Sequence, residues 1–269
     1  MFWSRLRSVF GGASRQDEQG PDALEWQQAL AAVPILQGFS REEEQTLIGL
    51  AQQLLARKTL TQLGVTLTPR QQAVLALQAV LPILHLGLDW YRGFHEIILI
   101  PEPVVRRQQV QDEFGLVREV EEENAGESWP QGPLVLAWSE LQQDGDWDGF
   151  NLVIHELTHK LDMLGGEADG APPLPAGMDP RQWTSALQSA FDAMQAQLDR
   201  HEPTAIDPYA ASHPAEFLAV CSECFFTDPL RLRDTYPAVY QQFTRFFGQQ
   251  PVTRFPATRL LAGEPEFHG

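Results

Sequence analysis

Two histidines that stand four residues apart in an apolar segment limit the possible folds and functions of this chain more than any other feature. His155 and His159 lie in the run Ile154-His-Glu-Leu-Thr-His-Lys160, which we expect to be helical. Four residues make just over one helical turn, so both imidazoles leave the same face and can close on one cation at about 2 Å. The residues around them are apolar: Leu152, Val153, Ile154, Leu157, Leu161 and Leu164. We therefore predict a buried helix, and buried imidazoles need polar partners.

The residue between the histidines predicts a role beside the cation. One residue turns a helix by about 100°, so the Glu156 carboxylate should lie next to the cation, where it can take a proton from a bound water. H-E-x-x-H is the pattern of zinc peptidases. The alternative is a surface helix with solvated His and Glu side chains, and the apolar flanks argue against it.

A zinc peptidase needs a third protein ligand. The metzincin pattern H-E-x-x-H-x-x-G-x-x-H is excluded, because Asp162 stands at its glycine position and Gly165 at its third histidine. A glutamate on a second helix is the natural alternative. Glu216 and Glu223 are two turns apart in an apolar helical segment, so one is expected to bind the metal and the other to lie behind it. Three residues in polar context are weaker candidates: Glu167, His201 and Glu202.

The order of helix and strand signals predicts a mainly helical α+β fold. The strand predictions are Glu96 to Pro101, and an antiparallel pair, Leu116 to Val120 with Leu134 to Trp138, around an acidic loop from Glu121 to Gly132. The motif helix is expected from about Trp147 to Leu164, followed by Gly165-Gly166 and a loop from Glu167 to Met178 that could form a substrate-facing wall. Further helices are expected from Ser40 to Lys58, from Thr68 to near Leu81, and after Asp179, His213, Asp228 and Tyr236, the last one ending at Gly248.

Charge and composition exclude several functions. A formal net charge of −17 repels phosphate backbones and anionic lipid surfaces, so we expect neither direct nucleic-acid binding nor membrane binding. A basic partner is favoured. Cys221 and Cys224 are expected to be small core residues of a helix. The N-terminal segment lacks the continuous apolar core of a signal peptide, and the most apolar run, Ala73 to Leu88, is too short to span a bilayer. These features predict a cytoplasmic protein.

Several longer segments together resemble one known family. They are Gly93 to Pro101, His155 to Asp162, Asp207 to Phe217 and Ser222 to Phe226. The chain is similar in them to the Mlc titration factor A family of bacterial zinc metallopeptidases, which are related in fold to the catalytic domain of anthrax lethal factor.

The resemblance implies a fold, a site and an activity. It implies a zincin-type fold with a small sheet packed on the motif helix and a second, glutamate-bearing helix. The domain should span residues 26–250, between a flexible N-terminal arm at 1–25 and a C-terminal tail at 251–269. One Zn²⁺ per chain would be held by His155, His159 and Glu216, with Glu156 as the catalytic base and Tyr209 assisting at the substrate carbonyl. The implied activity is that of an aminopeptidase on peptide substrates.

Two functional hypotheses from different classes follow. The resemblance also implies binding to an Mlc-like transcriptional repressor, and the acidic composition would suit a basic DNA-binding protein. The chain is then either a working zinc peptidase that also captures a repressor, or a non-catalytic repressor-binding protein whose zinc site is structural. The role of Asp162 also stays open, because this residue can accept the free N–H of an imidazole ligand or pair locally.

Overall fold

The computed structural model describes residues 20–111, 117–124, 126–128, 132–141 and 145–256. The mainly helical α+β prediction is confirmed. The helices in these ranges are α2 (Ala23–Ala32), α3 (Arg41–Arg57), α4 (Pro69–Val80), α5 (Trp138–Leu141), α6 (Leu152–Asp162), α7 (Pro180–Asp199), α8 (Pro214–Thr227), α9 (Pro229–Thr235) and α10 (Pro237–Phe247). Short 3-10 turns occur at η1 (Pro34–Leu36), η2 (Leu88–Tyr91), η3 (Met163–Gly165), η4 (Pro208–Ala211) and η5 (Pro251–Thr253).

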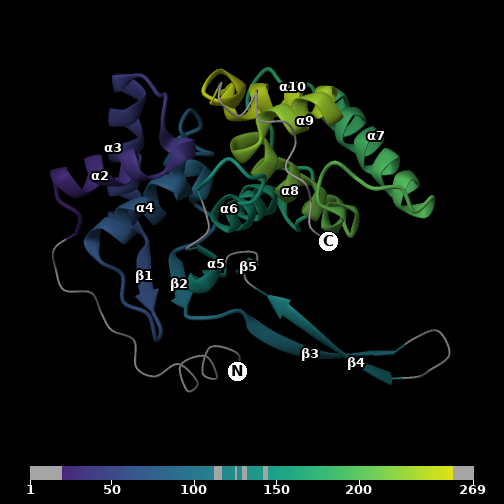
Figure 1. Ribbon diagram of the computed structural model, residues 1–269, viewed down its shortest axis with the longest axis horizontal. Helices are drawn as coiled ribbons and strands as arrows, with labels where there is room; N and C mark the ends of the chain where they lie inside the picture. The colour runs from purple at the N-terminus through teal and green to yellow at the C-terminus, as the bar shows by residue number, and fades with distance from the viewer. Residues whose placement is uncertain (1–19, 112–116, 125, 129–131, 142–144, 257–269) are drawn as a thin grey trace.

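A small sheet of order β1-β2-β6-β5 lies at one side of the helices (Figure 1). Strands β1 (Thr59–Gln62), β2 (Glu96–Ile100) and β6 (Leu134–Ala137) run parallel, and the edge strand β5 (Gly126–Ser128) is antiparallel to β6. All of β6 and most of β2 are buried, as continuous apolar strands of parallel sheets usually are.

The predicted antiparallel pair is wrong. The strand after Leu116 is β4 (Val117–Asn124), which pairs with β3 (Val104–Gln111), while β6 lies parallel to β2. The acidic stretch that begins at Glu121 was expected to be a loop, but its first residues continue β4. The register sets Arg106 opposite Glu122 and Arg107 opposite Glu121. The β3–β4 hairpin projects from the helical body (Figure 1).

The motif helix begins later than expected. The predicted start at Trp147 is wrong, because α6 begins at Leu152 and Asn151 is its N-cap. The Asn151 side chain accepts a hydrogen bond from the Ile154 backbone N–H at 2.9 Å, which satisfies a donor that the first helical turn leaves free. Gly149, with φ of 98°, turns the chain just before this cap.

The other helix predictions are confirmed at their start signals. Ser40 with Glu43, and Thr68 with Gln71, form capping boxes for α3 and α4, and α4 ends just before Pro82. Gly248 ends α10 with φ of 66°. Helix α2 was missed, although Asp22 and Glu25 form a capping box for it. Its start at Ala23 lies inside the predicted arm, and η5 lies inside the predicted tail.

Helix α6 runs through the middle of the molecule, between α4 and α8 (Figure 1). Its residues Val153, Ile154, Leu157 and Leu161 are buried in the main core. Cys221 and Cys224 of α8 are buried and free, as expected. Because α6 and α8 are held side by side by apolar packing, polar groups on their facing sides are brought together in a fixed geometry. Among the described helices, none combines the length and apolar character that a membrane span needs.

Candidate metal centre

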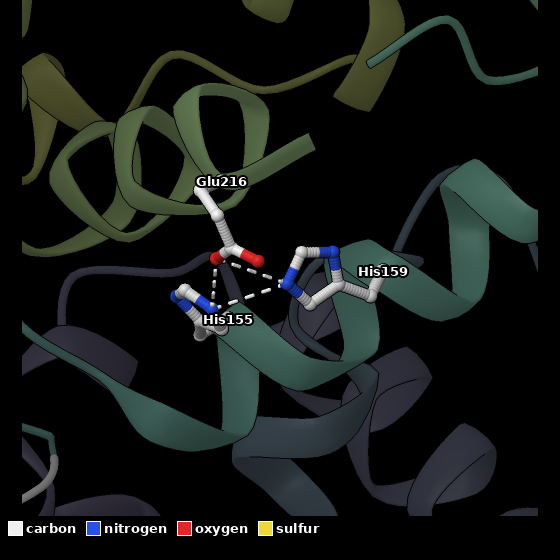
Figure 2. Close-up of side chains that lie close together, drawn as sticks. All are labelled: His155, His159 and Glu216. Carbon is white, nitrogen blue, oxygen red and sulfur yellow. Dashed lines mark hydrogen bonds and ion pairs between the residues drawn. The ribbon is translucent and has the colours of Figure 1, made fainter. Parts of the chain in front are cut away.

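The facing sides of α6 and α8 bring together two imidazoles and a carboxylate. His155 and His159 come from α6, and Glu216 comes from the first turn of α8, as Figure 2 shows. The two histidine Nε2 atoms are 3.2 Å apart. The Glu216 Oε2 atom lies 3.1 Å from Nε2 of His155 and 3.3 Å from Nε2 of His159. Among the described residues, these three form the group of His, Cys, Asp or Glu side chains that could hold a metal ion.

The spacing of these three atoms fits a small tetrahedral cation. Ligand atoms about 2.0 Å from a tetrahedral zinc lie about 3.3 Å from one another, close to the three observed separations. The buried Oε2 atom of Glu216 makes no well-aligned hydrogen bond with a described residue. Two imidazole nitrogens and one carboxylate oxygen at these separations are a donor set that could hold a metal ion.

Neighbouring charged groups shift the pKa values of Glu216 and His155 in opposite directions. Burial raises the pKa of Glu216, but the two imidazoles more than offset this and hold it well below its usual range. Burial lowers the pKa of His155, but the carboxylates of Glu223 and Glu216 outweigh it and raise this pKa well above the usual range. An imidazole must give up the proton on its ligating nitrogen to bind a metal. A metal held by Nε2 of His155 would have to replace a proton on that nitrogen.

Glu156 is buried beside the centre. Its side chain is 5% exposed, and Oε2 has no hydrogen-bond partner among the described residues. Burial raises the pKa of this carboxyl, while the cationic forms of His155 and His159 lower it. A desolvated carboxylate with an unused lone pair is suited to accept a proton.

The second candidate glutamate lies behind His155. Glu223 Oε1 is 2.7 Å from Nδ1 of His155, and Glu223 Oε2 accepts a hydrogen bond from the Asn151 backbone N–H at 2.7 Å. The structure thus places Glu216, and not Glu223, at the Nε2 atoms. Asn151 did not figure in the sequence reasoning, although an asparagine before an apolar helical run is an N-cap signal.

Two further candidate residues are placed clearly. Tyr209 lies on η4 with its ring centroid 6.4 Å from that of His155, and its side chain is 53% exposed.

Asp162 Oδ2 accepts a hydrogen bond from the Gly170 backbone N–H at 2.8 Å, so it pairs with the loop after α6. Burial raises the pKa of Asp162 to about 6. Gly170, which the sequence reasoning also missed, has φ of 81° and packs against the Pro214 carbonyl.

Comparisons with known proteins place the chain in a family of metallopeptidases. The model of a family described as glucose-regulated metallo-peptidase M90 matches residues 11–248. The chain belongs to this family of metallopeptidases, and the family resemblance expected from the sequence is confirmed. It is 44% identical over 234 residues to the Mlc titration factor A of Yersinia pestis (strain Pestoides F), and this covers 86% of each chain. The Mlc titration factor A of Yersinia pseudotuberculosis serotype O:1b (strain IP 31758) matches with the same identity and coverage.

Proposed function

We propose that the protein is a zinc peptidase of zincin-type fold in which His155, His159 and Glu216 hold one Zn²⁺ per chain. The observation that carries the proposal is the triangle of two Nε2 atoms and one carboxylate oxygen, with sides of 3.1 to 3.3 Å. Two imidazoles and a carboxylate are a donor set that zinc favours in catalytic sites.

The residues around the centre supply the proton transfers of peptide hydrolysis. Zinc held there supplies Lewis acidity, which lowers the pKa of water and polarises a carbonyl. In this proposal Glu156 accepts the proton of the attacking water and passes it to the leaving amine. The hydroxyl of Tyr209 donates a hydrogen bond to the oxyanion that develops on the carbonyl. The exposed position of Tyr209 leaves its side chain room to adjust to a substrate.

The proposed specificity is that of an aminopeptidase. The test is the hydrolysis of one short peptide in a free-amine and an N-acetylated form, with the Glu156→Gln variant as the matched control. Faster cleavage of the free-amine form, lost in the variant, supports the proposal. Equal cleavage of both forms would point to an endopeptidase, and undiminished turnover in Glu156→Gln would contradict the role of Glu156.

We also propose that the protein captures an Mlc-like transcriptional repressor in the cytoplasm. The support is the name of the relatives, Mlc titration factor A, together with a net charge of −17 that favours a basic partner. The alternative is a non-catalytic regulator with a structural zinc site. Capture of the repressor by wild type and by Glu156→Gln, with hydrolysis by wild type alone, would show two independent activities. Capture without hydrolysis by either protein would favour the alternative.

A further inference from the structure

A chain of buried hydrogen bonds leads from helix α4 to the rear nitrogen of His155. Gln78 of α4 accepts a hydrogen bond from Asn151 Nδ2 at 2.7 Å. The backbone N–H of Asn151 donates to Glu223 Oε2, and Glu223 Oε1 meets Nδ1 of His155, both at 2.7 Å. Gln78, Asn151 and Glu223 are each no more than 3% exposed, so this chain is shielded from water.

Asn151 is hydrogen-bonded to the backbone of His155 directly and to its ring through Glu223. Its carbonyl oxygen accepts the His155 backbone N–H at 3.0 Å, and its side-chain oxygen caps α6 through Ile154 N–H. Its own N–H meanwhile holds the carboxylate that contacts the His155 ring. The start of the helix and the orientation of the ring are therefore set by the same residue.

We propose that Glu223, Asn151 and Gln78 are positioning residues that hold His155 with its proton on Nδ1 and its lone pair on Nε2 directed at the Glu216 side of the centre. This inference rests on the proposed role of His155 as a metal ligand.

The geometry explains why a carboxylate is needed at position 223. Both groups that face it, the Asn151 N–H and the His155 Nδ1–H, are donors when Nε2 binds a metal. A carboxylate accepts from both, whereas a glutamine offers one acceptor and one N–H donor. In Glu223→Gln one of the two donors faces another donor, and the favourable ring orientation of His155 is lost.

The experiment compares three variants in a competition assay with a chromophoric zinc chelator. We expect Glu223→Gln to bind zinc about 10 to 100 times more weakly than wild type. Gln78→Leu removes the acceptor for Asn151 Nδ2 and should weaken binding in the same direction by a smaller factor. Ser222→Ala is the matched control, because Ser222 is buried next to Glu223 but its hydroxyl bonds to Leu218 O. Its zinc affinity should equal that of wild type.

A second readout reports on the ring itself. In zinc-loaded wild type, the His155 Nδ1–H proton should give a downfield, slowly exchanging NMR signal, because it is buried against Glu223. Glu223→Gln should lose this signal, and Ser222→Ala should keep it. Wild-type affinity together with a retained signal in Glu223→Gln would overturn the inference; should that variant not fold, the same result in Gln78→Leu would do so. Undiminished zinc binding by His155→Ala and Glu216→Ala would instead overturn the proposed metal site.

Discussion

Replacement of Asp162 by Asn should change the pH dependence of folding stability in a defined way. Asp162 is 1% exposed, and burial raises its pKa from 3.8 to about 6. The folded state therefore holds the proton of this carboxyl more tightly than the unfolded state does. Ionisation of this carboxyl does not affect stability well below pH 3.8, where it is protonated in both the folded and the unfolded state. The cost of ionisation grows as the pH rises and is fully present above about pH 6.

The size of this loss of stability follows from the pKa shift of Asp162. A change from 3.8 to about 6 corresponds to about 3 kcal/mol at about 1.4 kcal/mol per pKa unit. A neutral asparagine can still accept the Gly170 N–H through its side-chain oxygen, but it does not ionise. Relative to wild type, Asp162→Asn should thus gain about 2 kcal/mol in the free energy of unfolding between pH 4 and pH 7, because the unfolded carboxyl is already partly ionised at pH 4. Effects of the substitution that do not depend on pH cancel when the stability difference between variant and wild type is compared at the two pH values.

The assay is urea denaturation of the chelator-treated protein at several pH values between 4 and 8. The control is Asp192→Asn on α7, an exposed aspartate whose side chain accepts a hydrogen bond from Gln188; the stability difference it causes should change little with pH. A stability difference for Asp162→Asn that stays flat would refute the argument from burial. A difference of opposite sign would show that Asp162 is held ionised by a cationic partner such as the His159 ring.

Three further outcomes are expected. Glu156→Gln should lower the peptidase turnover about 10²- to 10⁴-fold with an unchanged zinc content by elemental analysis, and a loss of zinc would show a structural effect instead. Gly170→Ala should destabilise the fold by about 1–3 kcal/mol in urea denaturation, because φ is 81° and the new Cβ would lie 2.8 Å from the Pro214 carbonyl oxygen; unchanged stability would contradict this packing. Zinc affinity should rise by about tenfold per pH unit near neutrality, because His155, whose pKa is raised by its carboxylate neighbours, must release one proton on binding; a pH-independent affinity in a chelator-competition titration would contradict proton displacement.

Local signals in the sequence predicted the parts of the fold that depend on neighbouring residues. Ser40 with Glu43 marked the start of α3, and the spacing of His155 and His159 placed both rings on one face of α6. The strand pairing was wrong because β6 joins β2 across more than thirty residues of chain, and periodicity carries no information on such partners. The start of α6 was misplaced because Trp147 is buried, as an apolar helix residue would be, but lies in a bend before the helix.

The helix motif of the candidate site could be predicted from residue spacing, whereas Glu216 was preferred to Glu223 only through the family resemblance. Glu216 and Glu223 are two turns apart on one helix, and both approach His155 in the structure, one at Nε2 and the other at Nδ1. Which nitrogen of His155 each glutamate approaches depends on how α8 packs against α6. This packing is tertiary structure, which residue spacing within one helix does not predict. The local pairing of Asp162 with Gly170 likewise depends on the path of the loop from Glu167 to Met178.

The most direct test of the metal centre is an anomalous difference map from a crystal of the zinc-loaded protein, measured at the zinc absorption edge. One peak per chain is expected, about 2 Å from Nε2 of His155, Nε2 of His159 and a carboxylate oxygen of Glu216, with one side of the ion left open to water. A peak beside Glu223, a fourth protein side chain on the ion, or zinc bound only elsewhere on the chain would contradict the proposed metal centre.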